Sequence, residues 1–515
     1  MRQIIPIEIN AAQNRRSLPQ LLKSGEVQLR ENLQVIGTGE EKQTRKVPGA
    51  SRFSDSNTGT SYNSGIRYYS KGAIRKTFAF NVGTGTIYHI SDNGTESVSQ
   101  ANFSNTAIPV WETMRISSND VLYFSEGIST GMYSHDGNIG NSWVKETSVA
   151  LNFVSMVAHL DRLFGVEEDS EDLYFSKNLE PTNFTDSTDA GVITIGAKRG
   201  SKIIGIAILY GTMFIFKQDS IWKLIGRTPS EFEVIEVNPH LGAGARRSII
   251  NTDTGLIFLG SDYEFYGFGG TIDSTILLSY NIAIGGDLTK NLIPIINKTK
   301  MASVVGTYHN KIYRCSFVEN GQTANNIEWC FDTVNQIDFF TRGFNISCYI
   351  RWDRFPDANE LLTGRTDLGR LMRMNIGLNV DNGASSPFMR FRLKTKAILN
   401  PEPRNARFKR LFLNAEVLGA APVKIFTYVD GRYARSDAGE VQMETSGEVK
   451  TQIGPDLMSQ KFITSRVNLP YGTSKGRSFE LEIDTQARDI DFGITKFEVE
   501  TVVGKQVKKN ERVAV

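Results

Sequence analysis

The sequence predicts an all-β protein, and three observations support this fold class. The 515 residues include 46 glycines and many Asn, Asp, Ser and Thr residues, which favour turns. Short apolar runs alternate with these turns, whereas long stretches with the 3.6-residue period of an amphipathic helix are almost absent. A hairpin-like phrase also recurs along the chain. At this length we expect two or three domains.

The recurring phrase is a polar turn, a short β run, a second turn, and a second β run with an aromatic or large apolar residue. Its paired runs are 76–80 with 86–90, 120–124 with 131–135, 162–166 with 172–176, 213–217 with 220–224, 256–260 with 264–268, 311–317 with 327–331, and 360–364 with 370–374. A period of about 40–50 residues matches one four-stranded blade of a β-propeller. We therefore predict a propeller over residues 51–384 with about seven blades (six to eight), and repeated aromatics buried within it.

The N-terminal residues are predicted to help close this ring. Closure of a propeller protects the strand edges, and the last blade often borrows a strand from the other end of the chain. Residues 50–70, including the run 66–70, are the expected donor. Residues 1–50 are assigned as an N-terminal extended segment or strand donor.

The pattern changes after about residue 385, where longer runs alternate apolar and charged residues. These runs are 389–398, 407–418, 422–431, 461–470, 478–484 and 492–503. Strict alternation indicates sheets with one buried face. We predict a C-terminal β-sandwich over 385–503, a boundary in the turn-rich segment 379–388, and a polar tail at 504–515.

Basic residues cluster at the start of the predicted sandwich. They are Arg390, Arg392, Lys394, Lys396, Arg407 and Arg410. Alternation along a strand places the first four on one face. Three interpretations remain open: a solvated face, an interface with an acidic protein surface, and a contact with phosphate. We take an interface as the hypothesis for this cluster.

Charge and cysteine content narrow the function classes. Lys plus Arg total 58 and Asp plus Glu total 56, so the chain lacks the strong basic excess of a dedicated polyanion-binding protein. Cys315, Cys330 and Cys348 form no C-x-x-C pair, and we interpret them as reduced strand residues. The N-terminus lacks the apolar region of a signal peptide, and no apolar run is long enough to span a membrane, so we expect synthesis in a reducing cytoplasm.

No motif for catalysis or cofactor binding stands out. The H-E-x-x-H and phosphate-loop patterns are absent from the sequence. The acidic hairpin 167–172 and Asp262 offer the carboxylates that a glycosidase needs, but nothing distinguishes them from turn residues. His89 and His135 fall at equivalent places in successive repeats, which favours a packing role. We expect no enzymatic activity, no cofactor and no metal.

Several segments resemble one family. The run 29–53, with a basic turn at Lys46, Val47, Pro48 and Gly49, is similar to the opening of bacteriophage tail hub and nozzle propellers, although Val47 departs from their usual turn. The stretches 159–187 and 216–249, continuing to 255–270, resemble other recurring phrases of these proteins. The resemblance covers roughly residues 29–270 and implies a structural protein of the virion tail.

The resemblance also implies partners and a location. Such proteins form a ring, commonly a hexamer, around the DNA exit channel, dock on an adaptor or connector ring, and carry fibres or further tail proteins. The chain would be made in the host cytoplasm and would conduct or gate double-stranded DNA without sequence specificity. Segment 273–300 makes one repeat longer than the others. We predict that it forms the gate loop, with Asp273, Asp287 and Lys290 as its candidate residues.

Two other function classes remain as alternatives. The first is a receptor- or glycan-binding propeller of the tail tip, which exposed aromatic residues in repeated loops would favour. The second is a propeller enzyme that degrades host polysaccharide, which would require paired carboxylates in the central funnel.

Overall fold

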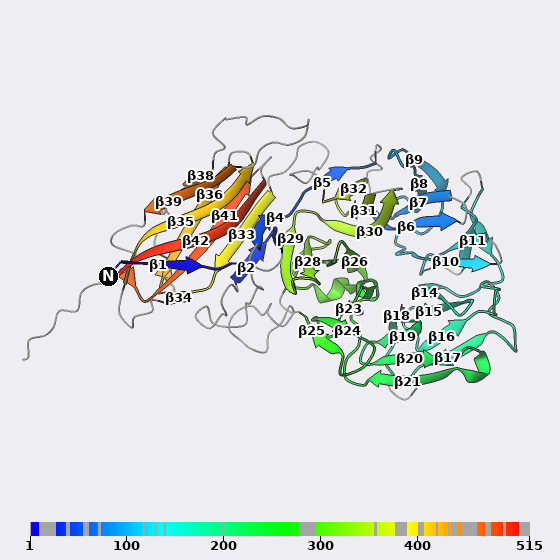
Figure 1. Cartoon of the computed structure of the whole chain (residues 1–515). Coiled ribbons are helices and arrows are strands. Elements are labelled where there is room, and N and C mark those ends of the chain that lie inside the picture. The colour runs from blue at the N-terminus through cyan, green and yellow to red at the C-terminus, as the bar shows by residue number, and fades with distance from the viewer. Residues whose placement is uncertain are drawn as a thin grey trace, which may run out of the picture.

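A computed structural model describes most of the chain and shows two parts (Figure 1). The described residues are 2–9, 27–37, 42–54, 61–70, 74–116, 119–128, 131–137, 141–197, 200–278, 295–354, 358–375, 389–399, 406–418, 421–430, 432–433, 440–443, 461–468, 475–487 and 491–503. A β-propeller and a β-sandwich lie side by side, so the predicted all-β fold class is confirmed.

Seven four-stranded antiparallel units form the propeller within the described ranges. Their strands are, blade by blade: β6 (Tyr62–Ser70), β7 (Ile74–Asn81), β8 (Thr86–Ile90), β9 (Glu96–Gln100); β10 (Val110–Ile116), β11 (Asn119–Ser125), β12 (Met132–His135), β13 (Val144–Glu146); β14 (Phe153–His159), β15 (Arg162–Glu167), β16 (Asp172–Phe175), β17 (Gly191–Thr194); β18 (Ile203–Leu209), β19 (Thr212–Lys217), β20 (Ile221–Ile225), β21 (Glu233–Asn238); β22 (Ile250–Asn251), β23 (Leu256–Leu259), β24 (Phe265–Phe268), β25 (Thr275–Leu277); β26 (Val305–His309), β27 (Ile312–Phe317), β28 (Ile327–Asp332), β29 (Ile337–Arg342); and β30 (Ile346–Arg354), β31 (Ala358–Arg365), β32 (Leu371–Met374), β5 (Ala50–Arg52).

The predicted paired runs are the second and third strands of the seven blades. The first strand of each blade contacts the first strand of the next, and β30 contacts β6, so the ring is closed. Within the described ranges, three 3-10 helices lie in connections: η3 (Pro229–Glu231), η4 (Arg246–Ser248) and η5 (Lys298–Ser303).

An apolar cluster fills the space between each pair of neighbouring blades. Between blades five and six, the rings of Phe265 and Trp329 stack with centroids 4.0 Å apart. Of the repeated residues, Trp329 and Met372 are buried as predicted. The others, Tyr88, Tyr133, Tyr174, Trp222 and Tyr266, are only half-buried against these clusters, so the prediction of buried aromatics is wrong for them.

The strand that closes the ring comes from the expected region of the chain. β5 pairs antiparallel with β32, with Arg52 opposite Met372, and completes blade seven. The expectation that the run 66–70 donates this strand is wrong, because these residues belong to β6, the innermost strand of blade one.

All six runs predicted for the sandwich are strands, and N-terminal strands join them. Its strands are β1 (Arg2–Ile7), β2 (Val27–Glu31), β3 (Leu33–Ile36), β4 (Gln43–Lys46), β33 (Met389–Thr395), β34 (Ile398–Leu399), β35 (Ala406–Leu418), β36 (Ala421–Val429), β37 (Arg432–Tyr433), β38 (Glu440–Met443), β39 (Lys461–Asn468), β40 (Lys475–Gly476), β41 (Ser478–Ala487) and β42 (Asp491–Val503). Segment 1–50 therefore divides: β1 to β4 pair within the sandwich, and β5 begins at its end. The predicted boundary at 379–388 and the tail 504–515 lie outside the described residues.

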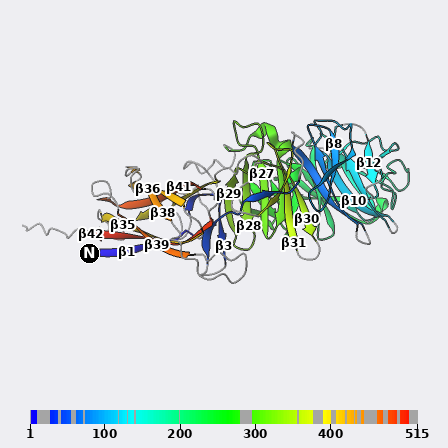
Figure 2. The ribbon, with the colours of Figure 1, turned by 90° about the horizontal axis from the view of Figure 1, so that it is seen from above.

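One continuous sheet joins the two parts of the molecule (Figure 2). Strand β2 pairs in parallel with β29 of blade six, through Glu31 and Phe340, and antiparallel with β33 of the sandwich. The resulting 11-stranded sheet has the order β26-β27-β28-β29-β2-β33-β41-β36-β37 along its main path. The propeller and the sandwich therefore share backbone hydrogen bonds.

Candidate functional site

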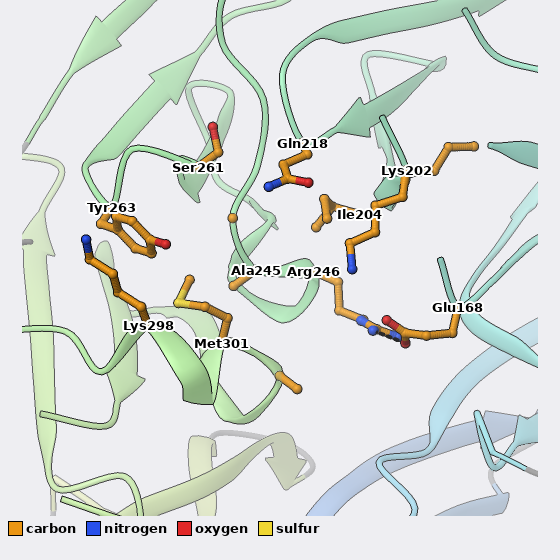
Figure 3. Close-up of a pocket in the computed structure, with 13 residues that line it drawn as sticks. Glu168, Lys202, Ile204, Gln218, Ala245, Arg246, Ser261, Tyr263, Lys298 and Met301 are labelled. Carbon is orange, nitrogen blue, oxygen red and sulfur yellow. Dashed lines mark hydrogen bonds and ion pairs between the residues drawn. The ribbon is translucent and has the colours of Figure 1, made fainter. Parts of the chain in front are cut away.

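Two adjoining cavities lie where the connections into the innermost strands meet the loops between second and third strands, and Figure 3 shows the larger one. The larger has a volume of about 280 Å³ and the smaller about 110 Å³. Glu168, Arg246 and Ala302 line both. We call the larger cavity the mouth pocket; Figure 3 shows Tyr263, Lys298 and Met301 on one side of it and Lys202, Arg246 and Glu168 on the other.

Backbone hydrogen bonds hold the loops around the mouth pocket in a fixed arrangement. The bonds run from Ile203 N–H to Ser170 O (2.8 Å), Gln218 N–H to Lys202 O (3.1 Å), Ala243 N–H to Lys217 O (2.9 Å), Gly244 N–H to Leu259 O (2.8 Å) and Ser261 N–H to Gly242 O (3.1 Å). They connect blades three, four and five. The pocket is thus built on paired backbone.

Close backbone approach explains the Gly-Ala-Gly-Ala sequence before Arg246. A Cβ atom on Gly242 would lie 2.1 Å from Lys217 O, and one on Gly244 would lie 2.6 Å from Gly260 O. Only glycine fits at such distances. The tight turn leads directly into η4, which carries Arg246 and Arg247.

Positive charge predominates in the mouth pocket. Three cations, Lys202, Arg246 and Lys298, and one carboxylate, Glu168, line it. Arg246 pairs with Glu168, and Lys202 pairs with Asp169 at the rim. The hydrogen bond from Lys202 lowers the pKa of Asp169 below its usual value. Lys298 Nζ instead lies 4.9 Å from the ring centroid of Tyr263.

Tyr263 has a strained backbone conformation at the edge of the pocket. Its φ is +67°, in the left-handed region that glycine and asparagine favour. Its N–H donates to Gly260 O at 3.0 Å, and the side chain of Asp262 accepts from Glu264 N–H at 3.2 Å, which fixes the turn. A left-handed non-glycine residue costs roughly 1–2 kcal/mol. Strain of this kind is concentrated at functional sites.

Arg247 reaches across the ring from the neighbouring position. Its guanidinium donates to Asn63 O and to Ser347 O, both at 2.8 Å, and so connects η4 to blades one and seven. Burial lowers its pKa to about 10. Ser248 supports it, since Tyr313 donates its hydroxyl to Ser248 O at 2.8 Å. The interior of the propeller is therefore crossed by a cation.

Glu112 is a carboxyl group on the innermost strand β10. Burial raises its pKa to about 7, while backbone hydrogen bonds from Thr113 and Ala158 oppose this shift. The Thr113 N–H donates to its Oε1 at 3.0 Å. This carboxyl changes charge near neutral pH.

The predicted basic cluster divides between the two sheets of the sandwich. Arg390, Arg392 and Lys394 lie on β33, with Lys396 just after it, and Arg407 and Arg410 lie on β35 in the facing sheet. Acidic residues neutralise part of it: Arg392 pairs with Glu482 (3.1 Å), Lys394 with Glu480 (3.7 Å) and Arg410 with Glu500 (3.4 Å). Arg390 is exposed, and Lys396 and Arg407 are half-buried. An interface role for this cluster remains a prediction.

Only part of the predicted gate loop falls in the described ranges. Asp273 is exposed in the turn before β25, whereas Asp287 and Lys290 lie outside the described residues. At the end of the segment, Ile295 and Ile296 are buried in the cluster between blades five and six. The following helix η5 contributes Lys298, Met301 and Ala302 to the mouth pocket.

The acidic hairpin, histidines and cysteines have structural partners. Glu167 accepts a hydrogen bond from the Asn152 N–H at 3.0 Å, and Asp262 accepts one from the Tyr266 hydroxyl.

His89 and His135 pack around Phe78, with ring centroids 5.9 and 5.1 Å from that of Phe78, as their repeat positions predicted. The three cysteines are buried strand residues without a disulfide, also as predicted.

The described residues contain neither a metal-binding cluster nor a membrane-spanning helix. No group of three or more His, Cys, Asp or Glu side chains in those ranges has the arrangement of a metal site. The helices within the same ranges are all too short and too polar to cross a bilayer.

Sequence reasoning did not predict that the residues of the mouth pocket lie together, although Glu168 falls in the acidic hairpin 167–172 and Lys298 in the segment 273–300. Lys202, Tyr263 and Lys298 lie in three separate connections, and no local motif distinguishes them. The one available signal was the Gly-Ala-Gly-Ala-Arg-Arg run at 242–247, in which alternating small residues before two arginines mark a tight turn.

Comparisons with known proteins leave the family open. No protein-family model and no curated protein matches the chain. Solved structures that match include the computationally designed Ika8 protein (9% identity, 63% of this chain, 99% of that chain, TM-score 0.36) and virginiamycin B lyase from Staphylococcus aureus (11%, 62%, 96%, 0.38). PorZ, a bacterial surface component of the type-IX secretion system of Porphyromonas gingivalis, matches at 10% identity over 76% of this chain and 46% of that chain, with a TM-score of 0.34.

Proposed function

We propose that the chain is a structural protein of a bacteriophage tail, a nozzle or hub subunit that forms a ring of about six copies around the DNA exit channel. The ring docks on an adaptor or connector ring, carries fibres or other tail proteins, and conducts or gates the genome during ejection. The protein resides in the virion tail after synthesis in the host cytoplasm. The sequence resemblance over residues 29–270 is one support.

The observation that carries the proposal is the 11-stranded sheet shared by the propeller and the sandwich. A subunit of a ring that transmits force must keep the angle between its parts. Backbone pairing of β2 with both β29 and β33 fixes this angle more firmly than a flexible linker would. The elongated subunit in Figure 2 has one end formed by the sandwich and the other by the propeller.

In this proposal the DNA passage lies between subunits and not through the propeller. Arg247 crosses the inside of each propeller and binds carbonyl oxygens of blades one and seven. The near-neutral charge of the chain (+2) would let DNA slide without strong binding. The proposal includes no catalytic role, consistent with the pairing of Glu168 with Arg246 and of Asp169 with Lys202.

Native mass spectrometry and negative-stain imaging of the purified full-length chain test the proposal. The chain is measured alone and after incubation with the connector and adaptor assembly of the same phage. We expect closed rings of about six copies in at least one condition. A chain that stays monomeric in both conditions contradicts it.

A further inference from the structure

We infer that the mouth pocket binds a sugar that bears one negatively charged group, a carboxylate or a phosphate. This site is independent of ring assembly, because it lies within one propeller and needs no second copy. At about 280 Å³ the cavity is near the lower end of the range for small-ligand pockets. A single sugar unit, and not a long chain, is the occupant that this size favours.

The charge of the lining residues selects an anion. Arg246 and Lys202 already have carboxylate partners, in Glu168 and Asp169. Lys298 differs from them: its ammonium lies next to the Tyr263 ring, and among the described residues no carboxylate pairs with it. An ammonium over an aromatic face still has free N–H donors. We therefore assign Lys298 as the residue that binds the anionic group.

The remaining lining residues suit a sugar ring. Gln218 and Ser261 provide both donors and acceptors, which hydroxyl groups need. Figure 3 shows the side chain of Gln218 directed into the space between Tyr263 and Lys202. The ring of Tyr263 and the side chain of Met301 form an apolar side of the same cavity. A sugar ring, with hydroxyl groups at its edge and apolar C–H groups on its face, fits a pocket that has both polar and apolar sides.

The ring of Tyr263 lies at the edge of the cavity beside Lys298. The equivalent turn of blade three has Asp169 with a φ of +56°, a residue type that tolerates this region better. Left-handed conformations also occur at Tyr210 and Leu160, outside the pocket. The position of the Tyr263 ring beside Lys298, and not its backbone strain, therefore supports contact with a ligand.

Calorimetric titration of the full-length chain tests the inference. The probes are glucuronate for the carboxylate, glucose 6-phosphate for the phosphate, and glucose as the neutral control. We expect at least one anionic probe to bind about tenfold more tightly than glucose. Its binding should weaken as the salt concentration increases. If glucuronate binds, the pocket recognises a carboxylate; if glucose 6-phosphate binds, it recognises a phosphate. Absence of binding by both anionic probes overturns the inference.

Two variants locate the site. Lys298→Gln is expected to weaken the anionic probe about tenfold, whereas Lys300→Gln, an exposed lysine on the same helix but outside the pocket, should leave binding unchanged. Tyr263→Asn should weaken binding while the midpoint of thermal unfolding stays equal or rises, because asparagine tolerates the left-handed region. A Tyr263→Asn protein that binds normally but unfolds at a lower temperature would show that the tyrosine serves folding alone, and would contradict the inference.

Discussion

The backbone N–H of Arg342, on the outermost strand of blade six, donates to Oδ1 of Asn32 at 2.8 Å across a sequence separation of 310 residues. Asn32 also donates its own N–H to Phe340 O at 2.7 Å and its side-chain amide to Arg390 O at 2.5 Å. Its φ of +55° allows the chain to leave β2 in one sheet and begin β3 in the other. One buried asparagine therefore connects the propeller to the sandwich.

Replacement of Asn32 is expected to weaken this junction. Asn32→Ala removes two side-chain hydrogen bonds and adds left-handed strain, which together should lower the free energy of unfolding by about 2–4 kcal/mol. Urea unfolding followed by tryptophan fluorescence and by circular dichroism should then separate into two transitions. Asn32→Gly is the control, because it removes the amide without the strain and should recover part of the loss. Coincident transitions at the wild-type midpoint would contradict this role.

Removal of the Arg247 guanidinium is expected to loosen the ring. Arg247→Met leaves Asn63 O and Ser347 O without their charged donor, a loss of about 2–4 kcal/mol in the free energy of unfolding. Arg246→Met is a matched control, because its partner Glu168 is half exposed and such pairs contribute only about 0–1 kcal/mol. Thermal unfolding measures both variants. Equal effects of the two substitutions would argue against the cross-ring connection.

A buried ion pair within blade six, which Tyr349 of blade seven contacts, should respond strongly to removal of one partner. Arg314 and Glu328 lie 3.2 Å apart and are 1% and 2% exposed, and Tyr349 donates its hydroxyl to Glu328 at 2.6 Å. Glu328→Leu leaves a buried arginine without this carboxylate and should cost about 3–5 kcal/mol in chemical unfolding. The double variant with Arg314→Met should regain much of the loss, since no unpaired charge remains. A double variant less stable than Glu328→Leu would refute this explanation.

The stability of the propeller should depend on pH through Glu112. Its pKa is about 7 in the folded chain and near 4.5 when exposed, so the folded state binds more protons between these values. The free energy of unfolding therefore falls as pH rises through this window, in contrast to an acid whose pKa is lowered by folding. The unfolding temperatures of wild type and Glu112→Gln are measured from pH 4.5 to 8. As pH increases, we expect the unfolding temperature of wild type to fall relative to that of the variant.

The histidines provide an internal check on this prediction. Burial lowers the pKa of His89, His135 and His159 below 6.5, so their contribution to stability is lost as pH falls through that range. Through these histidines the free energy of unfolding rises with pH, which is opposite to the effect of Glu112. Wild type and Glu112→Gln share the histidines, so this contribution cancels when their unfolding temperatures are subtracted. A difference that stays constant with pH would show that Glu112 is not buried in its neutral form.

By itself, the sequence determined the architecture, because β runs and turns are local signals and the blade repeats. The seven paired runs, the six sandwich runs and the packing of His89 and His135 followed from spacing and alternation alone. Tertiary structure decided the rest. Strands β1 to β4 join the sandwich, and the acids facing the basic strands come from β41 and β42, through pairing between distant segments that no local pattern encodes. The mouth pocket likewise exists only after neighbouring blades pack, because Lys202, Tyr263 and Lys298 become neighbours when blades four, five and six pack against each other.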